Sequence, residues 1–304
     1  MAAFERAVVL TNPMCTRAKS VRRRVAELAD SPYGRHLEVI PTKPDREATE
    51  EKIRQCLQPG DVLCVAGGDG TVNTAIRSAN VPILPLWGGN GNDLAHMLNG
   101  RPVRRPSRLL ERAEVVPIRP IRGDISIADE NTTEIAGSYA GFGAGALGAL
   151  RLDDGGHRKK IFYSIAAARM LYEADLLLKS LAEAQPFTVT RDGEKQSVYD
   201  ITLANGPRIA KVGRLPVQLT EERCFAFETT DKSFMPITQR MGALAIGRPS
   251  GSYITDKTYD FTVHEPVLAH FDAEPQILPP DTHVSLSLAE EPFYAVTTRL
   301  GVHC

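Results

Sequence analysis

The chain has 304 residues, enough for two modest domains, and its formal net charge is −1. This balance gives no support for a nucleic-acid partner, because nucleic-acid-binding proteins usually carry a basic surface. No run of about 18 apolar residues occurs, so no transmembrane segment is expected, and the first residues lack the apolar core of a signal peptide. The five cysteines are scattered and odd in number, which indicates neither a disulfide framework nor a zinc site and favours a cytoplasmic protein.

Strands and helices alternate over the first part of the chain, as far as about residue 120. The sequence predicts a strand over 7–11, a basic helix over about 17–29, a strand over 37–41, a charged helix over 45–57 and a strand over 62–66. Alternation of this kind predicts a doubly wound parallel sheet with helices on its faces.

The run Gly67-Gly68-Asp69-Gly70-Thr71 stands between that last strand and a helical pattern that begins near Thr71. Glycines at such a turn let the backbone come close to a ligand, and the helix start offers N–H groups that suit phosphate. A carboxylate beside a phosphate is repelled unless a cation lies between them, so Asp69 points to Mg²⁺, often held through water. The structural alternative is a tight turn in which Asp69 caps the helix.

A second glycine run, Gly88-Gly89-Asn90-Gly91-Asn92-Asp93, repeats the arrangement. It follows a strand candidate over 81–87 and precedes a helical pattern over 94–98. Two such turns, about one βαβ step apart, would lie side by side at the carboxyl edge of a parallel sheet, where open α/β sheets bind ligands. Neither turn is a Walker A loop, because no Gly-Lys-Ser/Thr follows the glycines. Residues 1–120 are therefore expected to form a nucleotide-binding α/β domain.

These two runs carry a resemblance to a known family. With Gly67–Thr71 and Gly89–Asp93, the chain resembles the diacylglycerol kinase catalytic-domain family, the lipid kinases that include bacterial enzymes and the sphingosine and ceramide kinases. The first motif is shared with NAD kinases and phosphofructokinases, whereas the second, followed by Leu-Ala, resembles the lipid kinases specifically. The resemblance implies an enzyme that binds ATP with Mg²⁺ and phosphorylates a lipid hydroxyl, most simply that of diacylglycerol, at a membrane surface.

The resemblance also implies the residues that bind the nucleotide and the metal. The nucleotide-binding set is Asn12, Thr42, Gly67, Gly68, Asp69, Gly70, Thr71, Asn73, Gly89, Asn90 and Asn92. Asp69, Asp93 and Asp124 would hold Mg²⁺ through water, Asp124 because Arg122-Gly123-Asp124-Ile125 resembles the family's Asp-Leu-Gly aspartate. Taken alone, Asp124 is more typical of a solvated residue at a strand end.

Three departures from the family pattern bear on this assignment. The opening loop, Asn12–Thr16, lacks the usual Ser and Gly, and Asn90 stands where the family has a nucleotide-contacting Thr. Bacterial members also carry a segment for a structural Mg²⁺, and the matching stretch here is Glu221-Glu222-Arg223-Cys224-Phe225. An arginine beside the carboxylates argues against a second metal site there.

For the general base, the family uses the Asp of a late Asp-Gly-Glu, and two segments qualify. Asp192-Gly193-Glu194 lies between β-like runs and predicts a hairpin turn, which Asp-Gly strongly favours. Asp272-Ala273-Glu274 matches the family's later position, with Ala in place of Gly. The base is therefore assigned to Asp272, with a surface turn as its structural alternative, and the nearby His270 is given no role.

The pattern changes after about Pro120, where β-like alternation replaces the helical one. Strands are expected over 124–128, 135–140, 197–203 and 259–263. Residues 121–291 are therefore predicted to form a largely antiparallel, β-rich domain for the lipid substrate, and the C-terminal segment 292–304 is expected to return to the first domain, as in the lipid kinases. The Arg- and Pro-rich stretch 101–108 indicates a connecting segment.

Two features of the second domain allow alternatives. The glycines of 141–148 fit a dinucleotide-binding fingerprint by spacing, but nothing after them resembles a βαβ unit, and the family's Gly-Phe-Gly turn from strand to helix suits them better. The pattern over 157–181 predicts a helix that covers the β-domain. The sharper alternative is that its basic start, 157–160, touches an anionic membrane surface that carries the lipid.

The sequence therefore predicts a cytoplasmic, two-domain lipid kinase with peripheral membrane contact, and it leaves both the lipid and a homodimer open. An NAD kinase is the enzyme alternative, disfavoured because NAD kinases carry an Asn-Glu pair where this chain has Gly-Asn-Asp. A nucleotide- or lipid-binding relic without turnover is the non-enzyme alternative, favoured by the altered loop at Asn12 and by Asn90 and Ala273.

Overall fold

The computed structural model describes residues 4–15, 17–89, 92–100, 103–128, 130–154, 179–180, 182–209, 213–230, 243, 247–248, 251–254, 258–272 and 274–297. The chain divides into two compact units. The first comprises Met1–Arg119 with Glu290–Cys304, and the second comprises Pro120–Ala289. Within the described residues, no helix is long and apolar enough to cross a membrane.

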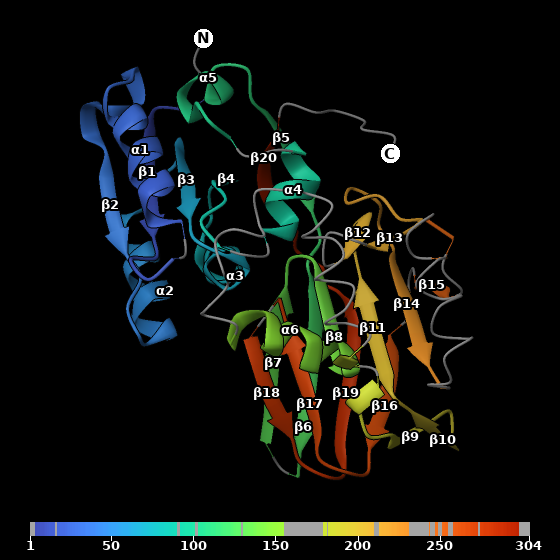
Figure 1. Ribbon diagram of the computed structural model, residues 1–304. Helices are drawn as coiled ribbons and strands as arrows, with labels where there is room; N and C mark the ends of the chain where they lie inside the picture. Colours follow the sequence, from blue (N-terminus) through green and yellow to red (C-terminus); the bar gives the residue numbers. More distant parts are fainter. Residues whose placement is uncertain are drawn as a thin grey trace. The chain divides into compact units, whose positions relative to one another are not determined.

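The first unit is built on a six-stranded sheet of mainly parallel strands (Figure 1). Its strands are β1 (Arg6–Thr11), β2 (Glu38–Pro41), β3 (Asp61–Ala66), β4 (Ile83–Pro85), β5 (Glu114–Ile118) and β20 (Phe293–Thr297). Their order across the sheet is β2-β1-β3-β4-β20-β5. All neighbours run in parallel except β20 and β5, and β3 is buried along its whole length. The last described strand of the chain thus completes the sheet that its first strands begin.

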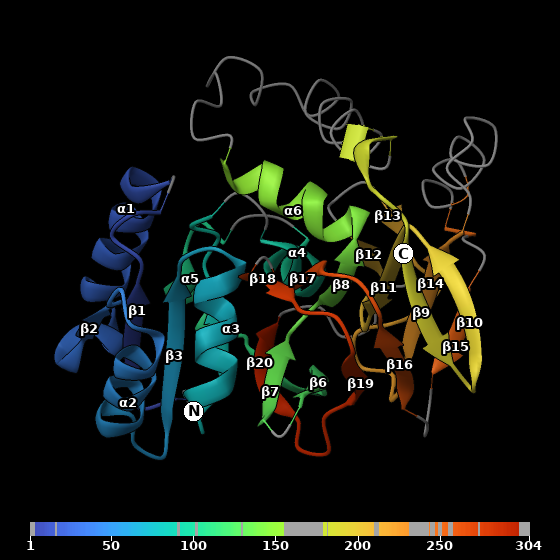
Figure 2. The same ribbon diagram turned by 90° about the horizontal axis from the view of Figure 1, so that it is seen from below.

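Helices cover both faces of this sheet. They are α1 (Ala18–Ala29), the 3-10 helix η1 (Pro32–His36), α2 (Arg46–Cys56), α3 (Asp69–Ser78), α4 (Asp93–Asn99) and α5 (Pro106–Leu110). The chain moves from β1 to β2 in one direction and from β2 through β3 to β4 in the other. Right-handed crossovers therefore place α1 on one face and α2 with α3 on the opposite face (Figure 2). This is a doubly wound arrangement, and its carboxyl edge carries the glycine turns.

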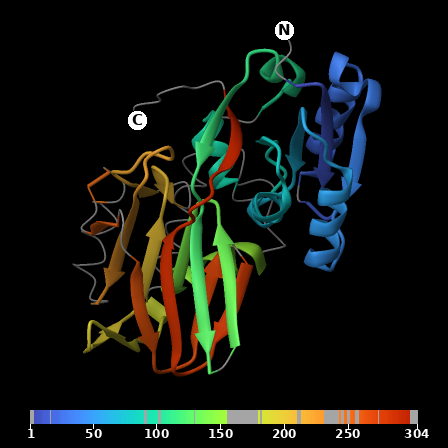
Figure 3. The ribbon, with the colours of Figure 1, turned by 180° about the vertical axis from the view of Figure 1, so that it is seen from behind.

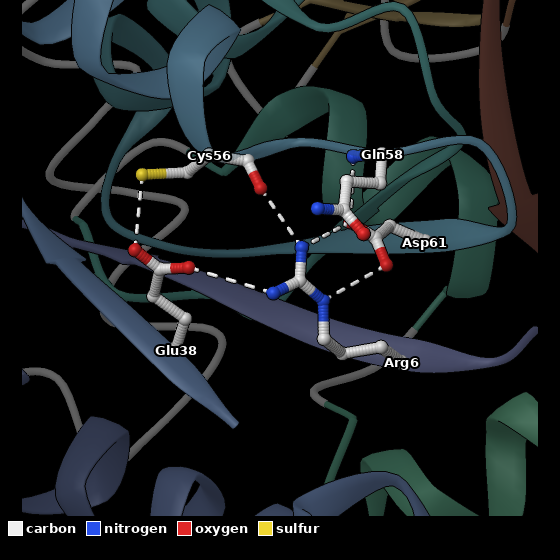
Figure 4. Close-up of polar contacts among 5 residues, drawn as sticks. All are labelled: Arg6, Glu38, Cys56, Gln58 and Asp61. Atoms are coloured by element: carbon white, nitrogen blue, oxygen red, sulfur yellow. Dashed lines mark hydrogen bonds and ion pairs between the residues drawn. The ribbon is translucent and has the colours of Figure 1, made fainter. Parts of the chain in front are cut away.

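A charged network ties three strands together at the opposite, amino edge (Figure 4). Arg6 of β1 donates to Asp61 of β3 through Nε at 3.0 Å and Nη2 at 2.6 Å, and Nη2 also donates to the carbonyl of Cys56. Glu38 of β2 lies 3.5 Å from Arg6 Nη1. The hydrogen bond to Asp61 raises the pKa of Arg6, against the opposing effect of burial. This network holds the strands in register without contributing to the carboxyl edge.

The second unit contains two six-stranded antiparallel sheets. One has the order β10-β9-β16-β19-β6-β7, built from β6 (Ile121–Ile127), β7 (Glu130–Ala136), β9 (Phe187–Arg191), β10 (Glu194–Val198), β16 (Tyr259–Val263) and β19 (Thr282–Leu288). The other has the order β15-β14-β11-β8-β17-β18, built from β8 (Tyr139–Gly143), β11 (Asp200–Ala204), β14 (Cys224–Thr229), β15 (Ser252–Ile254), β17 (Val267–Phe271) and β18 (Glu274–Leu278). Figure 3 shows β7, β6 and β19 side by side.

Apolar side chains from both sheets meet in one core, so the unit is a β-sandwich. Phe142 of β8 lies at its centre, edge-on to Phe261 of β16 at 5.1 Å and to Phe271 of β17 at 6.0 Å between ring centroids. The helix α6 (Ala144–Asp154) follows β8 directly, and a small pair, β12 (Arg208–Ile209) and β13 (Gly213–Arg214), completes the described strands. The predicted class, a doubly wound parallel sheet with a largely antiparallel β-domain, is confirmed.

Several predicted elements differ in detail, and two differ for the same reason. The run 197–203 is not one strand: β10 and β11 belong to different sheets, and the chain crosses between them at Tyr199. The run 135–140 divides likewise at Gly137 and Ser138, between β7 and β8. Alternation continues through such a crossing because the core lies on the inner face of both sheets.

The connecting segments also contain features that the sequence did not indicate. The stretch 101–108 includes the start of the short helix α5. The strand predicted over 81–87 is limited to β4, and Trp87 adopts a left-handed backbone with φ of 57°. Most of the helix predicted over 157–181, with its basic start, lies outside the described residues.

Candidate active site

The two glycine turns are in direct backbone contact. The N–H groups of Gly88 and Gly89 both donate to the carbonyl oxygen of Gly67, at 2.7 and 3.0 Å. A Cβ added to Gly89 would lie 2.3 Å from the Cα of Gly68, and one added to Gly67 would lie 2.3 Å from the Thr71 side chain. These glycines are therefore needed so that the turns can approach each other, and the two turns are joined by hydrogen bonds at the carboxyl edge of β3 and β4.

The side chain of Asp69 connects the two glycine turns. It is the first residue of α3, and its carboxylate accepts hydrogen bonds from the N–H groups of Asn92, at 2.5 Å, and Asp93, at 2.8 Å. Asp69 thus caps α4 rather than its own helix, and its negative charge lies at the positive end of the α4 dipole. Asn92 also stabilises the second glycine turn. Its side-chain amide donates to the carbonyl of Gly89 at 2.6 Å, and its side-chain oxygen accepts from the Gly89 N–H at 3.1 Å.

Asn12 and Thr42 lie at the same edge, after β1 and β2. The Asn12 N–H donates to the carbonyl of Ala66 at 3.2 Å, and its side-chain oxygen accepts from the N–H of Met14 at 2.9 Å. The Thr42 N–H donates to the carbonyl of Thr11 at 2.8 Å. The ends of β1, β2 and β3 therefore converge, and the first unit brings these two residues to the edge that carries the glycine turns.

Asn73 is the unusual member of the predicted nucleotide-binding set. It lies on α3, is fully buried, and has no hydrogen-bond partner for either side-chain amide atom among the described residues. Leaving a buried amide unpaired costs about 1–3 kcal/mol. A bound polar group that reached this amide would remove that cost. Thr71, also buried, packs against Gly67.

The carboxylates proposed to hold Mg²⁺ do not form a direct metal site. Over the described residues, no group of three or more His, Cys, Asp or Glu side chains is placed to bind a metal ion. Asp69 directs both oxygens to backbone N–H groups, and Asp93 is buried at the first position of α4. Asn90 lies outside the described residues. Among the described residues, the side chains at the glycine turns therefore do not provide three direct ligands for a metal ion.

Asp124 lies within β6 in the second unit, not at a strand end. Its carboxylate accepts from Arg122 Nε at 2.9 and 3.0 Å and from the Thr133 hydroxyl at 2.7 Å. Partial burial raises the pKa of Asp124, but the hydrogen bonds from Arg122 and Thr133 outweigh it and leave the pKa below its usual value. The Arg122 guanidinium already pairs with this carboxylate, so it would compete with a metal ion for the same oxygens.

Asp272 is buried, so the alternative of a surface turn does not describe it. It follows β17 in a left-handed conformation with φ of 49°, and its carboxylate accepts from three consecutive backbone N–H groups, those of Gly137, Ser138 and Tyr139. The last two donate at 3.0 to 3.1 Å. Asp272 thus anchors the loop at which the chain crosses from one sheet to the other. Ala273 lies outside the described residues.

Asp192, the competing candidate for the base, occupies the tip of a hairpin. It joins β9 to β10 with φ of 51°, followed by Gly193 with φ of 82°, as the Asp-Gly signal predicts. Its side chain is exposed. The segment 221–225 contains an ion pair instead of clustered carboxylates, because Arg223 donates to Glu221 at 2.9 Å and that hydrogen bond lowers the pKa of Glu221.

The glycine-rich run 141–148 forms the turn from β8 into α6, as the family resemblance implied. Gly143 has φ of 80°, and Asp200 accepts from the Gly145 N–H at 2.6 Å at the start of the helix. A Cβ on Gly145 would lie 2.8 Å from that carboxylate. Packing therefore explains Gly143 and Gly145. His270, behind this turn, is buried and edge-on to Tyr139, and burial lowers its pKa to about 4.

One group next to the glycine turns was not found from the sequence. Arg24 of α1 is 6% exposed, and its guanidinium donates to the carbonyls of Leu86 and, at 3.0 Å, of the left-handed Trp87. It thereby supports the residues that lead into Gly88. The available signal was the spacing of Ser20 and Arg24, which places them on one face of α1, just after Arg17 at its start.

Comparisons with known proteins agree with this architecture. Residues 6–121 match the family model described as the diacylglycerol kinase catalytic domain. A Bacillus anthracis crystal structure with a provisional diacylglycerol kinase assignment covers 98% of this chain and 99% of its own, at 16% identity and a TM-score of 0.67. A crystal structure of yeast NADH kinase complexed with NADH covers 97% and 84%, at 14% identity and a TM-score of 0.51. At such identities the likeness concerns the fold. No curated protein matches the sequence significantly.

Proposed function

Because residues 6–121 match the family model of the diacylglycerol kinase catalytic domain, we propose that the chain transfers the γ-phosphate of ATP to a lipid hydroxyl, most simply that of diacylglycerol. The match supports a kinase, and the lipid acceptor and the ATP donor are the proposed specifics. The observation that carries the proposal is the contact between the two glycine turns at the carboxyl edge of a parallel sheet, within the matched segment. Open α/β sheets bind their ligands at that edge.

The nucleotide would bind at the edge formed by the first unit. Asn12 and Thr42 converge there with the turns, and the buried amide of Asn73 supplies an unmet hydrogen-bonding group. Mg²⁺ would enter with ATP as part of the substrate, and it would neutralise phosphate charge next to Asp69 and Asp93. The role of Asp69 is then twofold: it holds the turns together through α4, and it presents negative charge toward the metal-bound phosphates.

The transfer itself needs a positioned acceptor and a base more than covalent chemistry from the protein. Asp272 would take the proton of the lipid hydroxyl. The hydroxyl oxygen would form a bond to the γ-phosphorus as the bond between that phosphorus and the ADP oxygen breaks. The three backbone N–H groups that hold Asp272 would fix the orientation of its carboxylate. Asp124, already paired with Arg122, is the weakest of the proposed metal-network residues.

An assay with several acceptors tests this function. The purified chain, [γ-³²P]ATP and Mg²⁺ would be incubated with diacylglycerol, ceramide or sphingosine in mixed micelles, and separately with NAD. We expect label in a lipid and none in NAD. Label in NAD alone would overturn the lipid proposal in favour of an NAD kinase; one structural neighbour is a yeast NADH kinase. ATP binding without any labelled product would indicate a nucleotide-binding protein that has lost turnover.

A further inference from the structure

Trp87, the residue directly before the second glycine turn, has a backbone conformation that a large side chain disfavours. Its φ is 57°, in the left-handed region. Five other described residues, glycine apart, have a positive φ: four are Asn or Asp, whose short polar side chains tolerate this region, and the fifth is Ala128. Trp87 is therefore the one bulky residue with this conformation within the described ranges. A strained backbone of this kind persists only where neighbouring contacts hold it.

Contacts to both the backbone and the ring hold Trp87 in place. Its carbonyl oxygen accepts a hydrogen bond from the Arg24 guanidinium of α1 at 3.0 Å. Its indole ring is stacked on the imidazole of His96 in α4, with 5.4 Å between the ring centroids and 24° between the planes. Trp87 is buried, with 8% of its surface exposed. Because the ring and the carbonyl both follow the N–Cα bond, a change in φ would displace one or both of them from these partners.

The same contacts determine how the second glycine turn meets the first. The Trp87 carbonyl and the Gly88 N–H belong to one planar peptide group. Arg24 donates to the carbonyl of this group, and the N–H donates to the carbonyl oxygen of Gly67 at 2.7 Å. His96, which stacks on the ring, lies in the first turn of α4, the helix whose start Asp69 of the first glycine turn caps. Trp87 therefore connects the peptide group that joins the two turns to the helix that follows them.

Packing alone does not explain a tryptophan at this position. The indole Nε1 is buried and has no hydrogen-bond partner among the described residues, whereas a buried indole N–H usually finds one. A leucine would fill the space without an unpaired donor, and a glycine would adopt the left-handed conformation without strain. Two unfavourable features thus occur together beside the candidate site. Strain concentrated at such a site indicates a role in positioning rather than in stability.

We propose that Trp87 is a positioning residue for the second glycine turn. Its left-handed backbone, held by the stack on His96, presets the peptide group of Gly88 in the orientation that joins the two turns. This inference rests on the proposed function, because it requires that the turns bind the phosphates of ATP. Trp87 acts through the backbone of Gly88. A preset turn spends no binding energy on its own ordering, so ATP binds more tightly than it would to a relaxed turn.

A double-mutant cycle for ATP affinity tests the coupling between the two rings. The variants are Trp87→Leu, His96→Leu and the double change, with affinity for ATP and Mg²⁺ measured by equilibrium dialysis and folding checked by urea unfolding. Trp87→Asn removes the ring but introduces a residue that tolerates the left-handed conformation. Tyr33→Leu is the matched control, because it removes another buried aromatic ring of the first unit, in the 3-10 helix η1.

We expect each single Leu variant to lose about tenfold in ATP affinity, as for a turn that adopts the competent form about a tenth of the time. The double variant should lose no more than either single variant, because the stack is already broken. Trp87→Asn should lose less than Trp87→Leu. Tyr33→Leu should be less stable to urea, with ATP affinity within about twofold of the parent. Trp87 is the only tryptophan in the chain, so its emission in His96→Leu reports directly on the released ring and should shift to longer wavelength.

Several results would overturn the proposal. Equal ATP affinity in the parent and Trp87→Leu would remove the positioning role, and additive losses in the cycle or an unshifted emission in His96→Leu would remove the stack as its cause. A loss in Trp87→Asn as large as in Trp87→Leu would contradict the role of the left-handed backbone. An equal loss in Tyr33→Leu would reduce the effect to general destabilisation. A parent chain that binds no ATP would contradict the proposed function itself, and this inference with it.

Discussion

Asp272 carries two roles in this account, and the change Asp272→Asn separates them. Asn adopts the left-handed conformation that the residue requires, so the turn itself should survive. The amide keeps one acceptor oxygen and replaces the other with a donor that faces the N–H groups of Gly137 and Ser138. The variant therefore loses one or two hydrogen bonds to a charged acceptor, and it loses a group that can take a proton.

The two losses differ greatly in size. A hydrogen bond to a charged group contributes about 1.5–3 kcal/mol, so the free energy of unfolding should fall by about 2–4 kcal/mol. A unit of ordinary stability that retains about 3 kcal/mol is still about 99% folded. Destabilisation alone would therefore lower activity only slightly. Loss of a positioned base, in contrast, lowers kcat by about 10²–10⁴-fold.

Steady-state kinetics, ATP binding and urea unfolding of the same preparations distinguish these effects. We expect kcat for Asp272→Asn to fall by at least about 100-fold, with ATP affinity nearly unchanged. Asp192→Asn is the matched control, because it makes the same change at a left-handed Asp in another hairpin, with an exposed side chain. It should change kcat by less than about threefold, as expected for a surface substitution. A dead Asp192→Asn enzyme beside an active Asp272→Asn enzyme would refute the assignment of the base.

Three further predictions follow from the same geometry. Asp69→Asn should remove most activity and also lower stability by about 1–2 kcal/mol, because one acceptor at the start of α4 is lost; unchanged activity and Mg²⁺ dependence would contradict this. Asp61→Asn should lower the free energy of urea unfolding by about 3 kcal/mol, because it leaves the Arg6 charge without its main partner, and leave ATP affinity unaltered. His270 has a pKa of about 4 in the folded chain against 6.5 unfolded, so the unfolded chain takes up the proton first. Stability should fall by up to about 3 kcal/mol as the pH drops from about 6.5 to 4, and His270→Leu should lack that part of the pH dependence.

Local signals predicted β1, β2 and β3 of the parallel sheet because each of these strands has a complete local pattern, whereas β5 was not predicted. The apolar run of β3 ends at glycines, and the next helix begins within a few residues, which is enough to place both turns at one edge of the sheet. The β-sandwich was harder to divide into strands. Its runs continue through Tyr199 and Ser138, where the chain changes sheets, and only tertiary pairing distinguishes such a crossing from one long strand.

The contacts of the site residues could not be predicted, because they depend on partners far away in the sequence. Asp69 binds N–H groups 23 and 24 residues away, and Asp272 binds N–H groups more than 130 residues away. The sequence identified these carboxylates by their position in motifs but gave no sign that both also anchor loops. It likewise indicated a basic helix over 17–29, without indicating that Arg24 is buried beneath the second glycine turn.

The stoichiometry of transfer tests the central claim most directly. ADP and phosphorylated lipid are quantified together, in mixed micelles with and without diacylglycerol, at several protein concentrations. The account predicts that ADP appears only when diacylglycerol is present, with one phosphatidic acid formed for each ADP. ADP release that does not require the lipid, or ADP without phosphatidic acid, would contradict the claim that a lipid hydroxyl accepts the phosphate.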